Sequence, residues 1–205
     1  MLVIKFTNSI FSSNTYLIYR EEEKDVWLID PGDSSQIFKW LKINDKIIKG
    51  ILLTHYHIDH IYGVNDFYEE YPGLKIYASE QSLVGLFSEK LNGSYYMEMP
   101  YVLTCKKIQI VDANSEINLF ENNIKALVLY TPGHNNDCIS FEIGKYLFTG
   151  DALIPGVKIH TKSKLGDKLL ALESIDRIVN QYARDTIICP GHGYICLLGD
   201  LVIDK

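Results

Sequence analysis

The sequence lacks the features that mark several broad classes of protein. It has four cysteines in 205 residues and no CxxC pair, so neither a disulfide scaffold nor a zinc-finger framework is expected. No apolar run reaches membrane-spanning length, and the N-terminus has no apolar stretch followed by a small-residue cleavage site. We therefore expect a cytoplasmic protein with no membrane partner, whose cysteines are reduced and mainly buried.

An excess of positive charge is also missing. Lysine and arginine number 20 against 26 acidic residues, which gives a net charge of −6 at pH 7. Nucleic acids and anionic membranes usually bind a broad basic surface, so nucleic acid is not an expected partner. Apolar residues make up 47% of the chain, and no repeat, low-complexity tract or linker interrupts it. We expect residues 1–205 to form one domain, of an oligomeric state that the sequence does not fix.

Short apolar runs bounded by turn residues predict strands along most of the chain. The expected strands are 16–19, 26–29, 47–53, 74–78, 107–111, 126–130, 140–143, 146–149 and 186–189. Helices are expected after Asp33, which with Gln36 resembles a capping box, and over about 80–91, with a helix or loop near 62–71. A further helix follows Asp167 as N-cap, with an apolar stripe of Leu169, Leu172, Ile175, Ile178, Val179 and Tyr182. This alternation favours sheets covered by helices.

Four of the expected strands run directly into a tight turn that carries a potential metal ligand. The ligands are His55 after 47–53, His134 after 126–130, Asp151 after 146–149 and His192 after 186–189. Ligands placed just beyond strand ends can converge on one edge of a sheet, where the strands behind them keep the geometry rigid. The recurrence predicts a metal site.

The segment His55-Tyr56-His57-Ile58-Asp59-His60 can serve two metals. An extended backbone points His55 and His57 the same way, and a following turn can swing Asp59 and His60 toward a second point. Imidazole and carboxylate suit Zn²⁺, Fe or Mn, whereas thiolate-rich sites are typical of structural zinc. A lone histidine at a strand end is as readily a core residue, but seven ligand-type residues after four strands favour a catalytic metal site.

These motifs resemble those of the metallo-β-lactamase fold superfamily, in particular its glyoxalase II-like branch. The motifs are Asp30-Pro31-Gly32, Thr54 to His60 with Gly63, Thr131-Pro132-Gly133-His134, Phe148-Thr149-Gly150-Asp151 and Pro190-Gly191-His192-Gly193. The resemblance implies an α+β fold, a four-layer αβ/βα sandwich with the site at one edge between two sheets. It also implies two divalent ions, with zinc expected and Fe or Mn as alternatives. The implied ligands are His55, His57 and His134 for the first ion, Asp59, His60 and His192 for the second, and Asp151 bridging both.

The activity implied by the resemblance is hydrolysis of a small thioester, ester, lactone or phosphoester by a hydroxide that the two ions share. Asp59 is expected to bind metal, to orient the hydroxide and to help move its proton. Asp151 stands where β-lactamases of the common zinc class carry cysteine, which points away from antibiotic hydrolysis. Asp30 is interpreted as part of a structural turn near the site rather than as a ligand.

The sequence departs from these relatives in three places. Glyoxalase II has an added C-terminal helical domain, whereas this chain ends thirteen residues after His192, which argues against its glutathione thioester substrate. Residues 135–138 replace the usual Thr-x-Gly after His134, so hydrogen bonds there can differ, and Cys138 is interpreted as a structural thiol rather than a ligand. The glycine-cysteine-glycine-arginine run that follows the aspartate in glyoxalase and persulfide dioxygenase relatives is also missing after Asp151.

Five further residues are candidate substrate contacts: Tyr95, Tyr96, Tyr101, Lys158 and His160. The tyrosines lie in an aperiodic, aromatic-rich stretch, 92–101, where packing against the domain is the alternative. Lys158, His160, Lys162 and Lys164 alternate, so an extended segment would put them on one face and attract an anionic substrate. A solvated charged edge is the alternative there.

Two other functions remain open from the sequence. One is a mononuclear iron oxygenase of the persulfide dioxygenase type, which would use His57, His134 and Asp151 or a similar subset. The other is a metal-binding scaffold without efficient catalysis. Metal content separates the oxygenase from the hydrolase, and turnover on an ester and phosphodiester panel tests the scaffold alternative.

Overall fold

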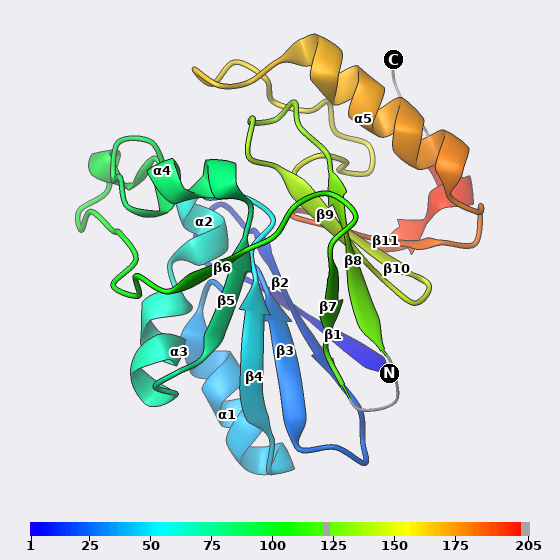
Figure 1. Ribbon diagram of the computed structural model, residues 1–205. Helices are drawn as coiled ribbons and strands as arrows, with labels where there is room; N and C mark the ends of the chain where they lie inside the picture. Colours follow the sequence, from blue (N-terminus) through cyan, green and yellow to red (C-terminus); the bar gives the residue numbers. More distant parts are fainter. Residues whose placement is uncertain (121–123, 202–205) are drawn as a thin grey trace. The chain divides into compact units, whose positions relative to one another are not determined.

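The chain forms two compact units, each built on a six-stranded sheet (Figure 1). The structure is a computed structural model that describes residues 1–120 and 124–201. The first unit comprises residues 1–78 and 82–110, and the second comprises residues 79–81 and those from 111 onward. No helix in these described ranges is long and apolar enough to cross a membrane.

The sheet of the first unit has its strands in the order of the sequence. They are β1 (Leu2–Thr7), β2 (Asn14–Tyr19), β3 (Asp25–Ile29), β4 (Ile47–Leu52), β5 (Lys75–Ala78) and β6 (Ile108–Ile110). The first three strands pair antiparallel, whereas β3 to β6 pair parallel. Because parallel neighbours end at the same edge, β3 and β4 bring the residues that follow them close together.

Helices pack against this sheet through an apolar cluster. They are α1 (Ser34–Asn44), α2 (Ile58–Ile61), α3 (Val64–Glu70) and α4 (Leu83–Leu86). Ile37 of α1 and Phe67 of α3 are fully buried in one cluster with Leu28 and Ile51 of the sheet. Three short 3₁₀ turns complete the described helical elements of the chain: Glu80–Ser82, Ser94–Tyr96 and Leu198–Asp200.

The second unit repeats the sequential strand order. Its strands are β7 (Glu116–Asn118), β8 (Lys125–Tyr130), β9 (Ile139–Ile143), β10 (Tyr146–Gly150), β11 (Ile187–Pro190) and β12 (Cys196–Leu197). Only β10 and β11 pair parallel, and the connection between them contains α5 (Lys168–Gln181). Ile178 of α5 is buried with Leu147 and Ile188, so the helix is held on the sheet by apolar contacts.

The four cysteines form no disulfide in the described chain. Cys105, Cys138 and Cys189 are buried and Cys196 is half-buried, as expected from the composition. Burial raises the pKa of the Cys189 thiol, so this side chain stays a neutral, apolar core group.

The expected helix over 80–91 is wrong in its length. A 3₁₀ turn and the single turn of α4 replace it, and α4 ends at Leu86. Gly85 lies so close to Tyr56 that an added Cβ would be 2.1 Å from the ring, which fixes the place of α4. Beyond α4 the chain turns so that the Asn92 carbonyl accepts a hydrogen bond from the Ile58 amide at the start of α2.

The capping box at the start of α1 is also wrong. Asp33 is the N-cap residue, but its side chain makes no cap hydrogen bond in the described chain. Its carboxylate instead accepts hydrogen bonds from the Ser9 amide, the Ser9 hydroxyl and the Tyr62 hydroxyl. Leu169 and Val179 are further corrections, because they are 66% and 38% exposed and do not join the apolar stripe of α5.

Candidate metal centre

In the first unit, the metal-ligand motif follows β4 and is supported by the end of β3. Asp30 comes directly after β3, and its amide donates to the Leu52 carbonyl at the end of β4. His55 is fully buried two residues after Leu53, and His57 is half-buried at the N-terminus of α2. The two parallel strand ends therefore place Asp30 next to the ligand segment.

The Asp30 carboxylate contacts both Thr54 and His60 of this segment. One oxygen accepts from the Thr54 amide at 2.8 Å, and the other accepts from the Thr54 hydroxyl at 2.6 Å and contacts His60 Nδ1 at 3.0 Å. Asp30 has a positive φ of 50°, a conformation that costs a non-glycine residue about 1–2 kcal/mol. The Thr15 hydroxyl stabilises this turn by donating to the Asp30 carbonyl and accepting from the Gly32 amide.

These contacts set the tautomers of two histidines. Since the Thr54 hydroxyl donates its proton to Asp30, the 3.0 Å contact with His55 requires Nδ1–H of His55 to be the donor. The Asp30 carboxylate likewise requires Nδ1–H on His60. The Nε2 lone pair of each ring is then the one available to a metal, the arrangement usual for metal-binding histidines.

Asp59 and His60, both on α2, offer two neighbouring atoms that could bind a metal ion. The Asp59 carboxylate lies 3.3 Å from His60 Nε2, and both side chains are buried. The backbone carbonyl of Asp59 accepts a 2.6 Å hydrogen bond from the Ser13 hydroxyl, which comes from the turn between β1 and β2. This buried bond fixes the start of α2 against the first two strands.

In the second unit, three ligand-type side chains meet at the ends of β8, β10 and β11. Asp151 follows β10, His192 follows β11, and the Gly191 amide donates to the Gly150 carbonyl between the two strand ends. One oxygen of Asp151 is 3.5 Å from Nε2 of His134 and 3.5 Å from Nε2 of His192. The carboxylate therefore stands between the two imidazoles.

His134 is held by the segment that follows Asp151. Its Nδ1 contacts the His160 carbonyl at 2.8 Å, and because a carbonyl only accepts, Nδ1 carries the proton and Nε2 faces Asp151. The turn before His134 is tied to α5, since the Asp167 amide donates to the Gly133 carbonyl and the Ser174 hydroxyl donates to the Pro132 carbonyl.

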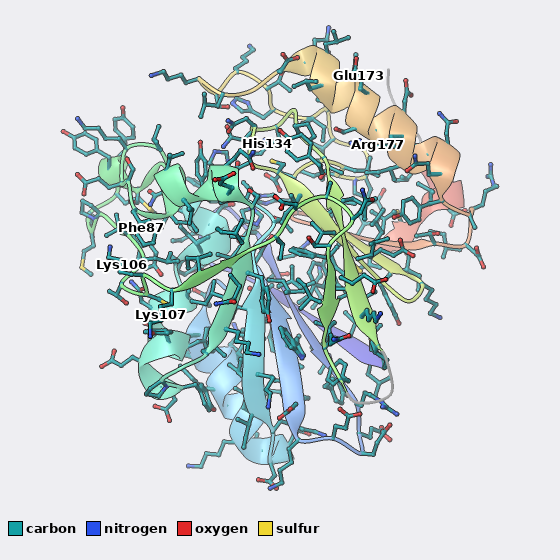
Figure 2. All side chains as sticks on the ribbon, viewed as in Figure 1. Phe87, Lys106, Lys107, His134, Glu173 and Arg177 are labelled. Carbon is teal, nitrogen blue, oxygen red and sulfur yellow. The ribbon has the colours of Figure 1, made fainter. Side chains whose placement is uncertain are left out.

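The guanidinium of Arg177 adds a third contact from α5. It donates to the Tyr130 carbonyl at the end of β8, four residues before His134. Figure 2 labels Arg177 on α5 and His134. One face of α5 therefore fixes the whole turn from the end of β8 to His134.

The spacing of these donors fits a metal ion better than hydrogen bonds between the side chains. Two atoms bound to one tetrahedral zinc at about 2.0–2.2 Å lie about 3.4 Å apart. The pairs Asp59–His60, His134–Asp151 and His192–Asp151 lie at 3.3, 3.5 and 3.5 Å. N–H···O hydrogen bonds are typically about 2.7–3.2 Å long. The donor set, imidazole and carboxylate, fits a catalytic divalent ion such as zinc.

The expected substrate contacts take different positions. Tyr95 is 48% and Tyr96 87% exposed, whereas the hydroxyl of Tyr101 donates to the Ile61 carbonyl and accepts from the Asn65 amide. Burial raises the pKa of Tyr101, so its hydroxyl remains a neutral link between the 92–104 segment and the α2–α3 region.

The predicted alternation after Asp151 is present in the second unit. Lys158, His160, Lys162 and Lys164 are exposed, and the intervening Ile159, Thr161 and Ser163 are half-buried. The alternate exposure leaves the four cationic or imidazole side chains in solvent, in a segment that belongs to no described helix or strand.

Asp30 and Thr54 are site residues that the sequence reasoning missed. The sequence predicts only a structural turn at Asp30, whereas in the structure its carboxylate also contacts Thr54 and His60. A signal was present, because Asp30 follows a strand end just as the ligands do. Which strand ends are neighbours depends on sheet order, and this could not be read from the motif alone.

Comparisons with known proteins agree with these observations. A profile described as "Metallo-beta-lactamase superfamily" matches residues 9–192. A hydroxyacylglutathione hydrolase of Buchnera aphidicola subsp. Baizongia pistaciae is 29% identical over 195 residues, covering 93% of this chain and 66% of the relative. One of Idiomarina loihiensis is 32% identical over 147 residues, covering 71% of this chain and 49% of the relative. The chain thus spans between about half and two thirds of these relatives.

Solved structures give the same grouping. The crystal structure of BLEG-1 B3 metallo-beta-lactamase superposes with a TM-score of 0.88 at 26% identity, covering 97% of this chain and 95% of that one. ETHE1 from Myxococcus xanthus superposes with a TM-score of 0.76 at 25% identity, covering 98% and 81%. The predicted α+β class and metallo-β-lactamase fold are confirmed. The chain belongs to the metallo-beta-lactamase superfamily.

Proposed function

We propose that the chain is a metal-dependent hydrolase in which seven side chains hold two divalent ions. The proposed ligands are His55, His57 and His134 for one ion, Asp59, His60 and His192 for the other, and Asp151 for both. The observation that carries this proposal is the position of Asp151, one oxygen of which lies 3.5 Å from Nε2 of two histidines. Such a carboxylate is suited to bridging two ions that each also take one of these imidazoles.

Zinc is the proposed metal, with Fe and Mn as alternatives, because every proposed ligand is an imidazole or a carboxylate. When bound, a pair of such ions lowers the pKa of a coordinated water and polarises the substrate oxygen. Hydrogen bonds to Nδ1 orient three of the proposed histidine ligands. Asp30 orients His60 directly and His55 through Thr54. The His160 carbonyl orients His134.

Asp59 is the proposed proton-handling residue. Its carboxylate is buried to 6% exposure and lies beside His60, so one oxygen can bind metal while the other accepts a proton from the attacking water. Its backbone is fixed by Ser13, which keeps the carboxylate in one position during the reaction.

The proposed substrate is a small thioester, because the curated relatives are named hydroxyacylglutathione hydrolases. Esters, lactones and phosphoesters belong to the same proposal, since attack on an acyl or phosphoryl centre needs the same groups. Tyr95, Tyr96 and Tyr101 remain proposed contacts of the uncharged part of the substrate. Lys158 and His160 remain proposed to attract its anionic part.

The test combines elemental analysis of the chain, purified without added metal, with thioester hydrolysis before and after chelation. We expect about two zinc ions per chain and hydrolysis that chelation abolishes. Asp151→Asn should lower kcat by more than about 100-fold and reduce the metal content. Substituting a residue that only hydrogen-bonds to a metal ligand already lowers metal affinity or activity by about 10–100-fold. Asp185→Asn, a change of the same type at an exposed position, should leave both unchanged.

Two results would overturn the proposal. About one iron per chain with oxygen uptake on persulfides would assign the oxygenase function instead. Stoichiometric metal without turnover on thioesters, esters, lactones or phosphoesters would assign a metal-binding scaffold.

A further inference from the structure

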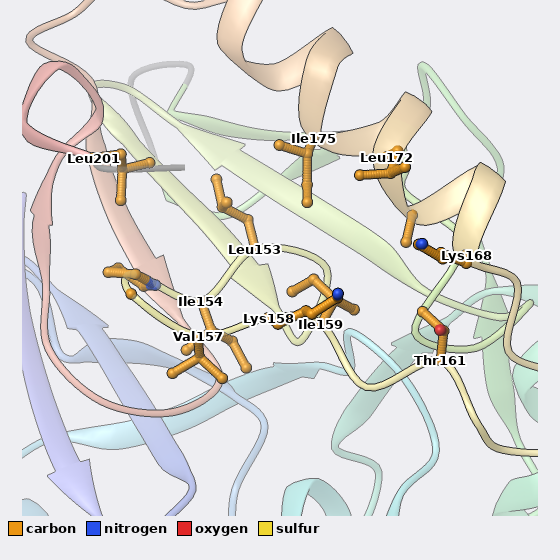
Figure 3. Close-up of a pocket in the computed structure, with 13 residues that line it drawn as sticks. Leu153, Ile154, Val157, Lys158, Ile159, Thr161, Lys168, Leu172, Ile175 and Leu201 are labelled. Carbon is orange, nitrogen blue, oxygen red and sulfur yellow. The ribbon is translucent and has the colours of Figure 1, made fainter. Parts of the chain in front are cut away.

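A cavity of about 140 Å³ lies in the second unit, between residues 153–161 and α5 (Figure 3). Its walls are mostly apolar, and Leu153, Ile159, Leu172, Ile175 and Leu201 are among the residues that line it. Lys158 from the loop and Lys168 from the first turn of α5 also line it, and none of the described lining residues is acidic. The cavity therefore combines apolar walls with positive charge.

The surrounding sequence strengthens that charge. Residues 152–170 contain four lysines and one acidic residue, although the whole chain has a net charge of −6. The acidic residue is Asp167, whose carboxylate accepts hydrogen bonds from the Leu169 and Leu170 amides at the start of α5. An anion entering the cavity consequently meets an attractive potential on an otherwise acidic protein.

The volume limits the apolar part of the ligand. A protein cavity of about 150 Å³ lined by aliphatic side chains holds one benzene molecule. The present cavity can therefore take about six carbon atoms. An anionic head group would remain beside the lysines, where it keeps contact with water.

The walls of the cavity are also the supports of His134. The loop wall leads into His160, whose carbonyl accepts from His134 Nδ1. On the helix wall, Ala171 packs against Gly133 so closely that an added Cβ on Gly133 would be 2.2 Å from the Ala171 Cα. A ligand that moves either wall must move the residue before His134 or the carbonyl that orients it.

We propose that this cavity binds a short-chain aliphatic carboxylate and that its occupancy changes the orientation of His134. The tail would lie among Leu153, Leu172 and Ile175, and the carboxylate would lie beside Lys158 and Lys168. This second ligand site shares Lys158 with the proposed substrate contacts, whereas Lys168 and the apolar walls belong to it alone, and its binding does not depend on turnover.

Calorimetric titration of the purified chain with butanoate, hexanoate, hexanol and hexylamine tests the ligand class. We expect saturable one-site binding of hexanoate, with affinity rising about fourfold per methylene from butanoate. Hexanol should bind more weakly, and hexylamine should not bind. Equal affinity for hexanoate and hexylamine, or no saturable binding of hexanoate, would overturn the proposal.

Paired variants test the location. Leu172→Phe narrows the cavity and should lower hexanoate affinity at least tenfold, while Val179→Phe on the same helix, outside the lining, should not. Lys168→Gln should lower hexanoate affinity about two- to fivefold without changing hexanol affinity, with Lys145→Gln as the matched control. Unchanged affinity in both Leu172→Phe and Lys168→Gln would place the ligand elsewhere.

The link to His134 has its own readout. The imidazole nitrogen resonances of His134 should shift when hexanoate saturates the protein, and the shift should disappear in Leu172→Phe. An unchanged His134 spectrum at saturation would overturn the coupling.

Discussion

The buried Asp30 carboxylate contacts His60 directly and His55 through Thr54, and both histidines are proposed metal ligands, so we expect its charge to affect metal binding. Asp30→Asn replaces one accepting oxygen by an NH₂ group that faces donors at Thr54 and His60. We expect metal affinity to fall by about 10–100-fold, as measured by competition with a chromophoric chelator. Asp33→Asn, at the other end of the same turn, should leave metal affinity unchanged. Equal metal affinities of the unaltered chain, Asp30→Asn and Asp33→Asn would show that Asp30 does not support metal binding.

Asp33 gives a pH dependence of stability at the same turn. Burial would raise its pKa, but hydrogen bonds from Tyr62 and Ser9 outweigh burial, and the pKa is lowered. A lowered pKa stabilises the fold above the pKa of the unfolded chain and loses that contribution as pH falls through the folded value. Asp33→Asn should therefore cost less than about 1 kcal/mol at pH 7, because this carboxylate is only half-buried. Urea unfolding should show the difference shrinking below about pH 4. A difference that stayed constant from pH 7 to pH 3 would contradict it.

The seven proposed ligands could be selected from the sequence because each follows an apolar strand at a glycine-containing turn or in the His55 to His60 motif. The residues behind them could not all be selected in this way. The His160 carbonyl reaches His134 from 26 residues away, and a backbone carbonyl leaves no mark in the choice of side chain. Thr54 likewise gains its role only because β3 and β4 are parallel neighbours.

At the scale of elements, the contact between α5 and the turn before His134 leaves no room for a side chain at Gly133. Gly133→Ala would put a Cβ 2.2 Å from the Ala171 backbone and displace the helix or the turn. Gly133 and Gly193 both have positive φ, at 138° and 79°, but a Cβ on Gly193 meets no atom within 4 Å. Gly193→Ala should therefore cost about 1–2 kcal/mol, and Gly133→Ala about 1–3 kcal/mol more. Thermal unfolding of the two variants measures the difference, and equal losses would mean that the α5 contact yields without cost.

The elements that the sequence predicted best are those whose stability is local. The strands before the ligands and the helix capped by Asp167 follow from apolar periodicity and a side-chain cap. The helix expected over 80–91 is limited to the single turn of α4, where Gly85 packs against Tyr56, a contact between residues distant in sequence that periodicity does not report. The strands β7 and β12 are three and two residues long, too short to show a period.

For the whole molecule, bound metal should add to the free energy of unfolding. If the seven ligands hold two ions in the folded chain alone, chelation should lower the unfolding temperature, and at a free ion concentration of 100 Kd each ion contributes about 2.7 kcal/mol. Calorimetry with and without chelator measures this effect. His57→Ala should show a smaller effect than the unaltered chain, whereas Asp185→Asn should match it. An unfolding temperature that chelation leaves unchanged would argue against metal binding in the folded state.

The sequential order of strands in both sheets bears on how the chain is made. Within each unit, every strand pairs with the one synthesised immediately before it, from β1 to β6 and from β7 to β12. A nascent chain can therefore extend each sheet as residues leave the ribosome, without waiting for a distant partner strand. Each parallel pair must also wait for the helices in its connection, and α5, between β10 and β11, is the last of these helices to be synthesised. The last slow step of biosynthetic folding should accordingly be the parallel pairing that brings His192 beside Asp151.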